Sequence, residues 1–212
     1  MHIFFPSCNY TKASPQNAKI TRDFFKERMN VAGCCLYDKK EYTDQDVGFV
    51  LCQACRGQLE SKIRVRTIWE YFDEDPNFVF PDYKHQKMNL QDCFRDIDHP
   101  EVHQAIRNIL KKMNIDVIEI ENNKDKSTFC GTLHFHTTSP IILDLMSQYP
   151  DTKLSKMPEE VQTQIMEEYV KVFDLNYPVI CDCNRCLKGV NMGKANGVHL
   201  LDLIMGKQKS ID

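Results

Sequence analysis

The stretch VGFVLCQAC (residues 47–55) leads a short apolar run into a C-x-x-C turn, and this combination is the main indication of the fold. A second copy, YPVICDCNRC, occupies residues 177–186. A short apolar run bounded by turn residues is consistent with a buried strand, and helical patterns follow over 63–72 and 198–205. The sequence therefore predicts the same strand–turn–helix unit twice.

Nine of the ten cysteines follow one pattern that is written twice. The first copy contains Cys8, Cys34, Cys35, Cys52 and Cys55, and the second contains Cys93, Cys130, Cys183 and Cys186. Thiolates drawn together from distant parts of a chain suit soft metals and iron–sulfur clusters, and four of them saturate one zinc ion or one cubane. The sequence predicts two thiol-rich metal sites. For the tenth, Cys181, a small buried apolar side chain is the favoured interpretation.

Other segments of the two halves also correspond. FFPSC (4–8) matches NLQDC (89–93), and amphipathic helices are expected over 16–29 and after Pro100. Strands that alternate with helices predict βαβ units with mostly parallel sheets. We therefore expect an α/β protein made of two such repeats, related by a pseudo-twofold axis. Sites in such sheets form at the carboxyl ends of strands, where the cysteines lie.

The expected organisation is a first repeat over residues 1–76, a linker over 77–88 and a second repeat over 89–212. The linker contains prolines and several charges, which is typical of a connection. The second repeat carries an insertion, 132–176, that includes an expected helix over 158–173. Long excursions at the ends of sheets usually serve a site, so we expect this insertion to cover the second set of cysteines.

Composition and charge limit the classes of protein to which this sequence can belong. The 212 residues are 42% hydrophobic with a formal net charge of -3, which gives no general attraction to nucleic acid. No apolar run reaches the length of a membrane span. The first residues, MHIFFP, lack the features of a signal peptide. We therefore expect a cytoplasmic protein whose cysteines stay reduced and free to bind metal.

The cysteine order Cys, Cys-Cys(-Gly), C-x-x-C, written twice, resembles the cysteine-rich CCG domain. That domain occurs in the cysteine-rich subunit of heterodisulfide reductase and in iron–sulfur subunits of lactate and glycolate oxidation systems. Residues 90–120 followed by FCG (129–131) look like the family's cysteine–helix–strand–CCG stretch, and VICDCNRCLKG (179–189) looks like its closing motif. The resemblance covers residues 3–206.

The resemblance implies a noncubane [4Fe-4S] cluster on Cys8, Cys34, Cys35, Cys52 and Cys55. A second cluster on Cys93, Cys130, Cys183 and Cys186 is an open alternative, because Phe129 replaces the first cysteine of the pair. It also implies electron transfer to or from a thiol/disulfide or organic-acid system, as a component of a heterodisulfide-reductase-like oxidoreductase. The chain has no flavin, nicotinamide or ferredoxin-type motif, so an electron-supplying iron–sulfur or flavin protein is the expected partner.

The function itself has an alternative. The protein could be a zinc-stabilised binding or scaffold module of the same fold, since zinc also binds four cysteines.

Several residues allow two interpretations. Cys181, His134 or His136 could substitute for the thiol missing at Phe129, because Cys181 and Cys183 would share one face of a regular strand. The residues that follow the C-x-x-C turns, Arg56, Arg185 and Lys188, are expected on the solvated surface. No catalytic residue is predicted.

Overall fold

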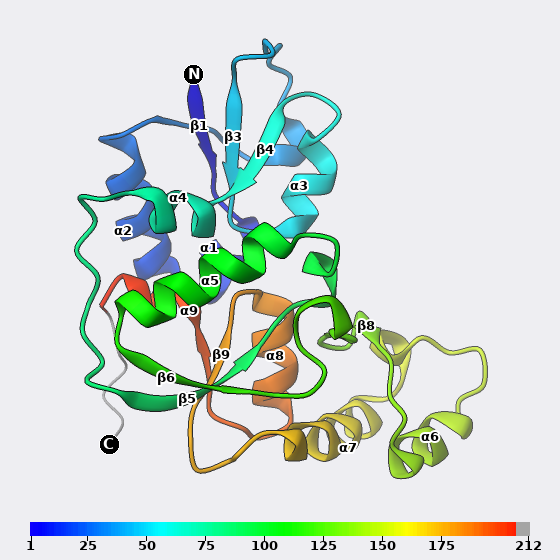
Figure 1. Ribbon diagram of the computed structural model, residues 1–212. Coiled ribbons are helices and arrows are strands. Elements are labelled where there is room, and N and C mark those ends of the chain that lie inside the picture. The colour runs from blue at the N-terminus through cyan, green and yellow to red at the C-terminus, as the bar shows by residue number, and fades with distance from the viewer. Residues whose placement is uncertain (207–212) are drawn as a thin grey trace. The chain divides into compact units, whose positions relative to one another are not determined.

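The computed structural model describes residues 1–206 and has the expected α/β architecture (Figure 1). The last six residues of the second repeat, 207–212, lie outside the described part. The chain divides into two compact units. The first contains Met1–Pro81, Gln104–Ile109 and the residues from Leu201, and the second contains Asp82–His103 and Leu110–Leu200.

The first unit contains a parallel sheet of four strands in the order β2-β1-β3-β4 (Figure 1). The strands are β1 (His2–Phe5), β2 (Asn30–Val31), β3 (Val47–Val50) and β4 (Arg64–Thr67). The central strands are almost continuously buried, as expected of a parallel sheet with helices on its faces.

The second unit repeats this topology. Its parallel strands are β5 (Gln86–Gln91), β6 (Ile115–Glu119), β9 (Val179–Cys181) and β10 (Gly197–His199), in the order β10-β9-β5-β6. Read from the other edge, this is β6-β5-β9-β10, so each strand has a counterpart in the first sheet. The prediction of two repeats with mostly parallel sheets is confirmed. A short antiparallel pair, β7 (Phe129–Cys130) and β8 (His134–Phe135), belongs to the second unit.

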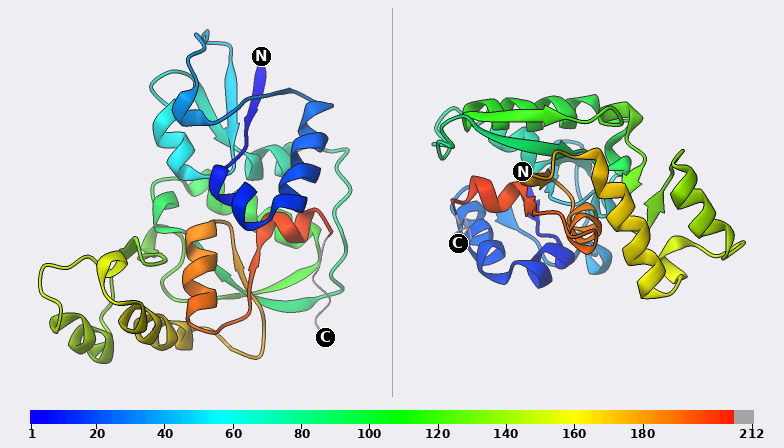
Figure 2. Two further views of the ribbon diagram at one scale, coloured as in Figure 1. Left: turned by 180° about the vertical axis from the view of Figure 1, so that it is seen from behind. Right: turned by 90° about the horizontal axis from the view of Figure 1, so that it is seen from below.

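Nine α-helices lie in the described residues (Figures 1 and 2). They are α1 (Cys8–Ala13), α2 (Pro15–Lys26), α3 (Gln53–Leu59), α4 (Ile68–Glu74), α5 (Pro100–Lys112), α6 (Pro140–Ser147), α7 (Glu159–Tyr169), α8 (Asn184–Met192) and α9 (Leu200–Ile204). Helices α3 and α8 begin within the two C-x-x-C turns, and α8 lies beside β9 (Figure 1).

Several boundaries differ from the sequence-based expectations. The helix expected over 16–29 is α2, which begins at Pro15 and ends at Lys26. The helix expected over 158–173 is α7, continued by a 3₁₀ turn over Val170–Val172. The expected linker, 77–88, is not wholly a connection, because strand β5 begins at Gln86. That strand gives a weak sequence signal since it carries Gln86, Lys87, Asn89 and Gln91, whose polar side chains are atypical of a buried strand.

The polar residues of β5 have structural partners. The Asn89 side chain donates to the backbone oxygen of Asp174 at 2.9 Å and accepts from its N–H at 3.1 Å, which fastens the segment before β9 to the strand. The Gln91 side chain accepts a hydrogen bond from the Tyr169 hydroxyl of α7. A buried polar group is tolerated when it is hydrogen-bonded in this way, so these residues tie the insertion to the sheet.

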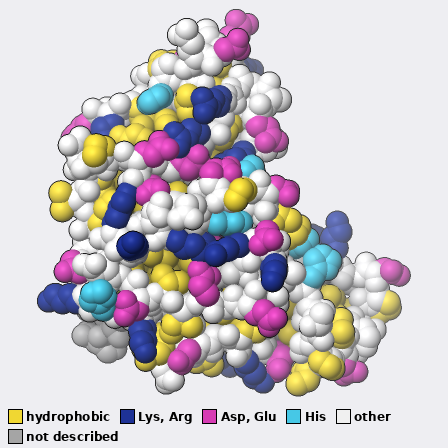
Figure 3. All heavy atoms as spheres, viewed as in Figure 1, with side chains coloured by type: hydrophobic (Ala, Val, Ile, Leu, Met, Phe, Trp, Pro, Cys, Tyr) yellow, Lys and Arg dark blue, Asp and Glu magenta, His cyan; other side chains and the backbone are white. Residues whose placement is uncertain are grey.

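On the face drawn in Figure 3, basic and acidic side chains are interspersed. None of the described helices is long and apolar enough to cross a membrane.

Candidate metal centres

The first set of cysteines lies at the carboxyl ends of β1 and β3. Cys8 begins α1, which is capped by the Ser7 hydroxyl accepting from the Tyr10 N–H at 3.3 Å. Cys52 follows β3 closely and is the N-cap of α3, which carries Cys55 in its first turn. Cys34 and Cys35 come from the loop after β2, where a 3₁₀ turn spans Cys35–Tyr37. Three segments that follow the carboxyl ends of strands thus supply all five thiols.

Each of the five thiols contacts at least one other thiol of the set. The Cys8 and Cys34 sulfurs are 3.5 Å apart, and the Cys35 and Cys55 sulfurs are 3.2 Å apart. Cys52 is hydrogen-bonded to Cys55. Cys8 is exposed, Cys55 is buried and the other three are half-buried. The sulfur contacts therefore run from the exposed Cys8 to the buried Cys55.

The local surroundings shift the pKa values of these thiols in different directions. The backbone N–H group of Leu36, then the Cys8 thiol and the Tyr37 N–H, point to the Cys34 sulfur, and these hydrogen bonds lower the pKa of the Cys34 thiol. Hydrogen bonding to Cys52, followed by burial, raises the pKa of Cys55. Hydrogen bonding to Cys34, followed by burial, raises the pKa of Cys8. Of these thiols, Cys34 therefore favours the thiolate, while Cys8 and Cys55 favour the thiol in the absence of metal.

Arg56, expected on the solvated surface, is buried instead. Its guanidinium lies 3.8 Å from the Glu70 carboxylate of α4, which also accepts from the Thr67 N–H at 2.7 Å. A buried guanidinium needs such a charged partner, which explains why the side chain turns inward. Arg185 and Lys188 are exposed as expected.

In the second unit, hydrogen bonds across the ends of β5 and β6 position Cys93. The Asn123 side chain accepts from the Asp92 N–H at 3.0 Å and donates to the Leu90 oxygen at 2.8 Å. The Ser127 hydroxyl donates to the Asp92 oxygen at 2.7 Å. These bonds fix the backbone immediately before Cys93.

Cys130 reaches the site through a close approach between backbone segments. Gly131 follows it with φ +57°, and a Cβ atom there would lie 2.3 Å from the backbone oxygen of Arg185. Only glycine fits that position, both because of its left-handed φ and because the loop touches α8. Cys130 is thereby held next to the helix that carries Cys186.

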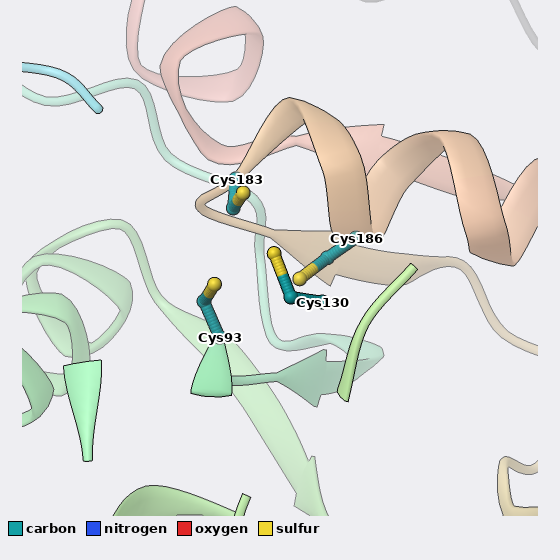
Figure 4. Close-up of side chains that lie close together, drawn as sticks. All are labelled: Cys93, Cys130, Cys183 and Cys186. Atoms are coloured by element: carbon teal, nitrogen blue, oxygen red, sulfur yellow. The ribbon is translucent and has the colours of Figure 1, made fainter. Parts of the chain in front are cut away.

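The four cysteines of the second set converge, and their side chains point toward one another (Figure 4). The Cys93, Cys130, Cys183 and Cys186 sulfurs all lie within 4.8 Å of one another. In the part of the chain that the structure describes, this is the one compact group of three or more metal-ligating side chains. These four cysteines lie close enough to hold a metal.

The four thiols of the second set differ in pKa, mainly because they are hydrogen-bonded to one another. Bonds from the other three thiols to the Cys130 sulfur strongly lower the pKa of Cys130. The bond to Cys130 raises the pKa of Cys93, and burial raises the pKa of Cys186. Without metal, the buried group holds thiolate and thiol side by side. A metal cation would displace the remaining protons.

The insertion packs over this second site, as expected from its length. Ile165 and Met166 of α7 belong to the same buried apolar cluster as Cys93, Cys130 and Cys186. Helix α7 also approaches α8 closely, because a Cβ on Gly193 would lie 2.4 Å from the Met166 backbone oxygen. The insertion therefore shields the site from solvent.

Phe129, which replaces a cysteine of the pair, is part of this core. Its ring is fully buried and stacks on Tyr169 of α7, with centroids 4.2 Å apart and planes 10° apart. It also lies against α8, since a Cβ on Gly189 would come within 2.7 Å of the ring. The aromatic ring thus joins the insertion to the repeat at the point where the first copy has a thiol.

A role for Cys181 as a substitute ligand requires a strand that continues to Cys183. The strand ends at Cys181, and Cys183 is already the N-cap of α8, so the two do not share a strand face. Cys181 is fully buried in the apolar cluster and is not one of the four converging cysteines. The interpretation as a core side chain describes it better.

His134 and His136 lie beside the second site but do not belong to the group of four converging cysteines. His134 pairs with Cys130 across β7 and β8, and its ring stacks on Phe94 with centroids 3.2 Å apart. His136 lies 4.7 Å from His134, ring centre to ring centre. Burial, together with the charges of His136 and Arg95, lowers the pKa of His134. His134 therefore borders the site as a neutral ring, with His136 beside it.

Asp182, which lies between Cys181 and Cys183, forms a buried carboxyl pair beside the second set of cysteines. Asp182 and Asp96 are both buried and are hydrogen-bonded to each other. Burial, then the nearby charge of Asp96, raises the pKa of Asp182. Two carboxyl groups in such contact share a proton rather than both ionise. No local sequence signal distinguishes this pair from surface turns.

The two sets of cysteines suit different metal centres. Zinc–sulfur bonds of about 2.3 Å in a tetrahedron place sulfurs roughly 3.8 Å apart, which fits the four converging cysteines. The five thiols of the first set exceed the four that saturate one zinc ion or one cubane, which leaves a thiolate to bridge two irons. Comparison with protein-family models, curated proteins and solved structures finds no match to this chain.

Proposed function

We propose that the protein is an iron–sulfur redox protein similar to the cysteine-rich subunit of heterodisulfide reductase. In this proposal the first set of cysteines holds a [4Fe-4S] cluster, which supplies one-electron chemistry when bound. The substrate system is a thiol/disulfide pair or an organic acid. A partner iron–sulfur or flavin protein supplies or accepts the electrons.

The observation that carries the proposal is the group of five contacting thiols at the carboxyl ends of the strands in the first unit. Cys8 and Cys34 form its exposed end, and Cys55 forms its buried end. Five thiolates exceed the need of a single tetrahedral ion. One end in solvent would let a small substrate or a partner protein approach the bound group.

For the second set, the proposal is a single tetrahedral ion rather than a second cluster. The four sulfurs lie within 4.8 Å of one another and are shielded by the insertion. A closed four-thiolate site of this kind suits a structural zinc. This compactness is also what favours the second candidate function, a zinc-stabilised scaffold module, in which neither set holds a cluster.

Metal and sulfide analysis of the full chain separates the two functions. After anaerobic reconstitution with iron and sulfide, the redox protein should bind about four irons at the first set, as the cluster formula requires. The Cys52→Ser/Cys55→Ser variant should lose these irons and keep the second-site ion. The Cys183→Ser/Cys186→Ser variant should do the reverse.

A Cys181→Ala variant serves as the matched control, because Cys181 is a buried cysteine outside both sets. It should keep all metal. Iron content that is unchanged in Cys52→Ser/Cys55→Ser would overturn the cluster assignment. A protein that takes up zinc but no iron or sulfide would establish the scaffold function instead.

A further inference from the structure

We infer that Cys8 and Cys34 form a disulfide when the first site is empty, so that oxidation of this outer thiol pair closes the site to its metal. The inference concerns regulation of the site named above and rests on that proposed function for its consequence. The disulfide itself requires only the cysteine geometry of the first unit.

The sulfur positions carry the inference. The Cys8 and Cys34 sulfurs are 3.5 Å apart before any bond is made. A disulfide needs about 2.05 Å, so the sulfurs must approach by roughly 1.5 Å. Cys8 is exposed and Cys34 is half-buried, so a small oxidant reaches this pair first.

The neighbouring thiols are arranged so that this pairing is selected. Cys35 is directed to Cys55, 3.2 Å away, and Cys55 is buried and also bonded to Cys52. Cys35 lies within hydrogen-bonding reach of Cys34 as well. However, adjacent Cα atoms are about 3.8 Å apart, which is shorter than the roughly 4.4–6.8 Å that disulfides span. Cys8 is therefore the favoured partner of Cys34.

The reaction proceeds by thiol–disulfide exchange with a low-molecular-weight disulfide, RSSR. The Cys34 sulfur attacks one sulfur of RSSR, forming a mixed disulfide and releasing RSH. The Cys8 sulfur then attacks the Cys34 sulfur, forming the Cys8–Cys34 bond and releasing the second RSH. Two cysteine thiols are oxidised and one RSSR is reduced, with both protons ending on the two RSH molecules.

The consequence for the site follows from ligand count. The disulfide removes two of five thiolates, and a sulfur in a disulfide is no longer a thiolate ligand. Three thiolates remain, fewer than the four that a cluster of this kind takes from cysteine. Reduction by a thiol would reopen the site. Three thiols of the second set are buried and Cys183 is half-buried, so the same oxidant should react there more slowly.

The test uses the full chain, stripped of metal anaerobically and incubated with glutathione disulfide. Free thiols are blocked and tryptic peptides are mapped by mass spectrometry. Peptide 1–12 carries Cys8, 29–39 carries Cys34 and Cys35, and 41–56 carries Cys52 and Cys55. The expected product links 1–12 to 29–39. The link should persist in Cys35→Ser and disappear in Cys34→Ser, two variants that alter adjacent residues.

Each outcome bears on the inference separately from the cluster. A 1–12 to 29–39 link that survives in Cys34→Ser but not in Cys35→Ser overturns it, as does oxidation that joins only 29–39 to 41–56. If the link forms and the oxidised protein still takes up as much iron as the reduced protein, closure of the site is wrong. If the link forms and neither form takes up iron, the disulfide stands and the cluster function fails.

Discussion

Cys52 and Cys183 occupy the same backbone position in the two repeats. Each is the N-cap residue of the helix that follows the second central strand, with φ/ψ of -123°/129° for Cys52 and -121°/128° for Cys183. Neither makes a side-chain capping hydrogen bond. The repeat therefore extends from the order of the strands to the torsion angles of a proposed ligand.

This position allows a test that separates folding from metal binding. Serine is a good N-cap residue, so Cys52→Ser and Cys183→Ser should each stabilise the metal-free protein, by about 0.5–1 kcal/mol. Each variant should also weaken metal binding at its own site only. Chemical denaturation with and without metal measures both effects. A variant that is less stable than the wild type in the metal-free state would contradict the capping argument.

The acidity of the second site predicts how its metal affinity depends on pH. The pKa values of Cys93 and Cys186 are raised, so both carry protons at neutral pH without metal, whereas the pKa of Cys130 is lowered. Metal binding releases the two protons, so affinity rises with pH and falls in acid. Two released protons correspond to about a hundredfold change in apparent affinity per pH unit. Competition titrations with a zinc chelator at several pH values measure the slope, and a flat profile would contradict the assignment.

Gly131 and Gly33 offer a matched pair beside the cysteine motifs. In Gly131→Ala the new Cβ would collide with the Arg185 oxygen at 2.3 Å, and the positive φ adds about 1–2 kcal/mol. We expect lower stability and weaker second-site binding, because Cys130 is displaced. Gly33 has open space around a Cβ, so Gly33→Ala should change stability by less than about 0.5 kcal/mol. Thermal unfolding and metal titration of both variants check this, and equal effects would argue against the close contact.

The insertion can be tested through one buried and one exposed isoleucine. Ile165 of α7 is fully buried in the cluster that contains the cysteines, whereas Ile141 of α6 is 57% exposed. Ile165→Ala should lower the unfolding free energy by about 2–5 kcal/mol and speed metal loss from the second site. Ile141→Ala should change neither. Urea unfolding and chelator-driven release kinetics give both quantities, and unchanged release in Ile165→Ala would mean that α7 does not shield the metal.

Much of the fold is predictable because the apolar runs and the repeated cysteine motifs can be recognised in the sequence alone. The order of the cysteines and the apolar runs before each C-x-x-C are enough to predict two parallel sheets. The segment 63–72, whose pattern predicts a helix throughout, holds β4 and then α4. Thr67 and Glu70 form a capping box at this boundary, so the start of the helix has a local sequence signature.

The details of the candidate sites depend on contacts that the sequence does not specify. The compactness of the four second-set sulfurs arises from Gly131 touching α8 and from Asn123 fixing the turn before Cys93. The role of Cys181 depends on where β9 ends, and strand ends are among the least certain features of sequence-based prediction. The contact between Cys8 and Cys34 links residues 26 positions apart, so only the folded chain reveals it.

Phe129 gives the sharpest distinction between the two repeats. Restoring the missing thiol with Phe129→Cys should not restore a fifth ligand, because adjacent residues of a strand point to opposite faces and Cys130 already faces the site. The substitution would leave a cavity where the ring stacks on Tyr169. We therefore expect unchanged metal stoichiometry and a loss of about 3 kcal/mol in unfolding free energy. Phe129→Leu, which keeps most of the apolar volume, should recover much of that stability. Metal analysis with urea unfolding decides the matter, and extra iron bound by Phe129→Cys would show that the second repeat lacks only a thiol to accept a cluster.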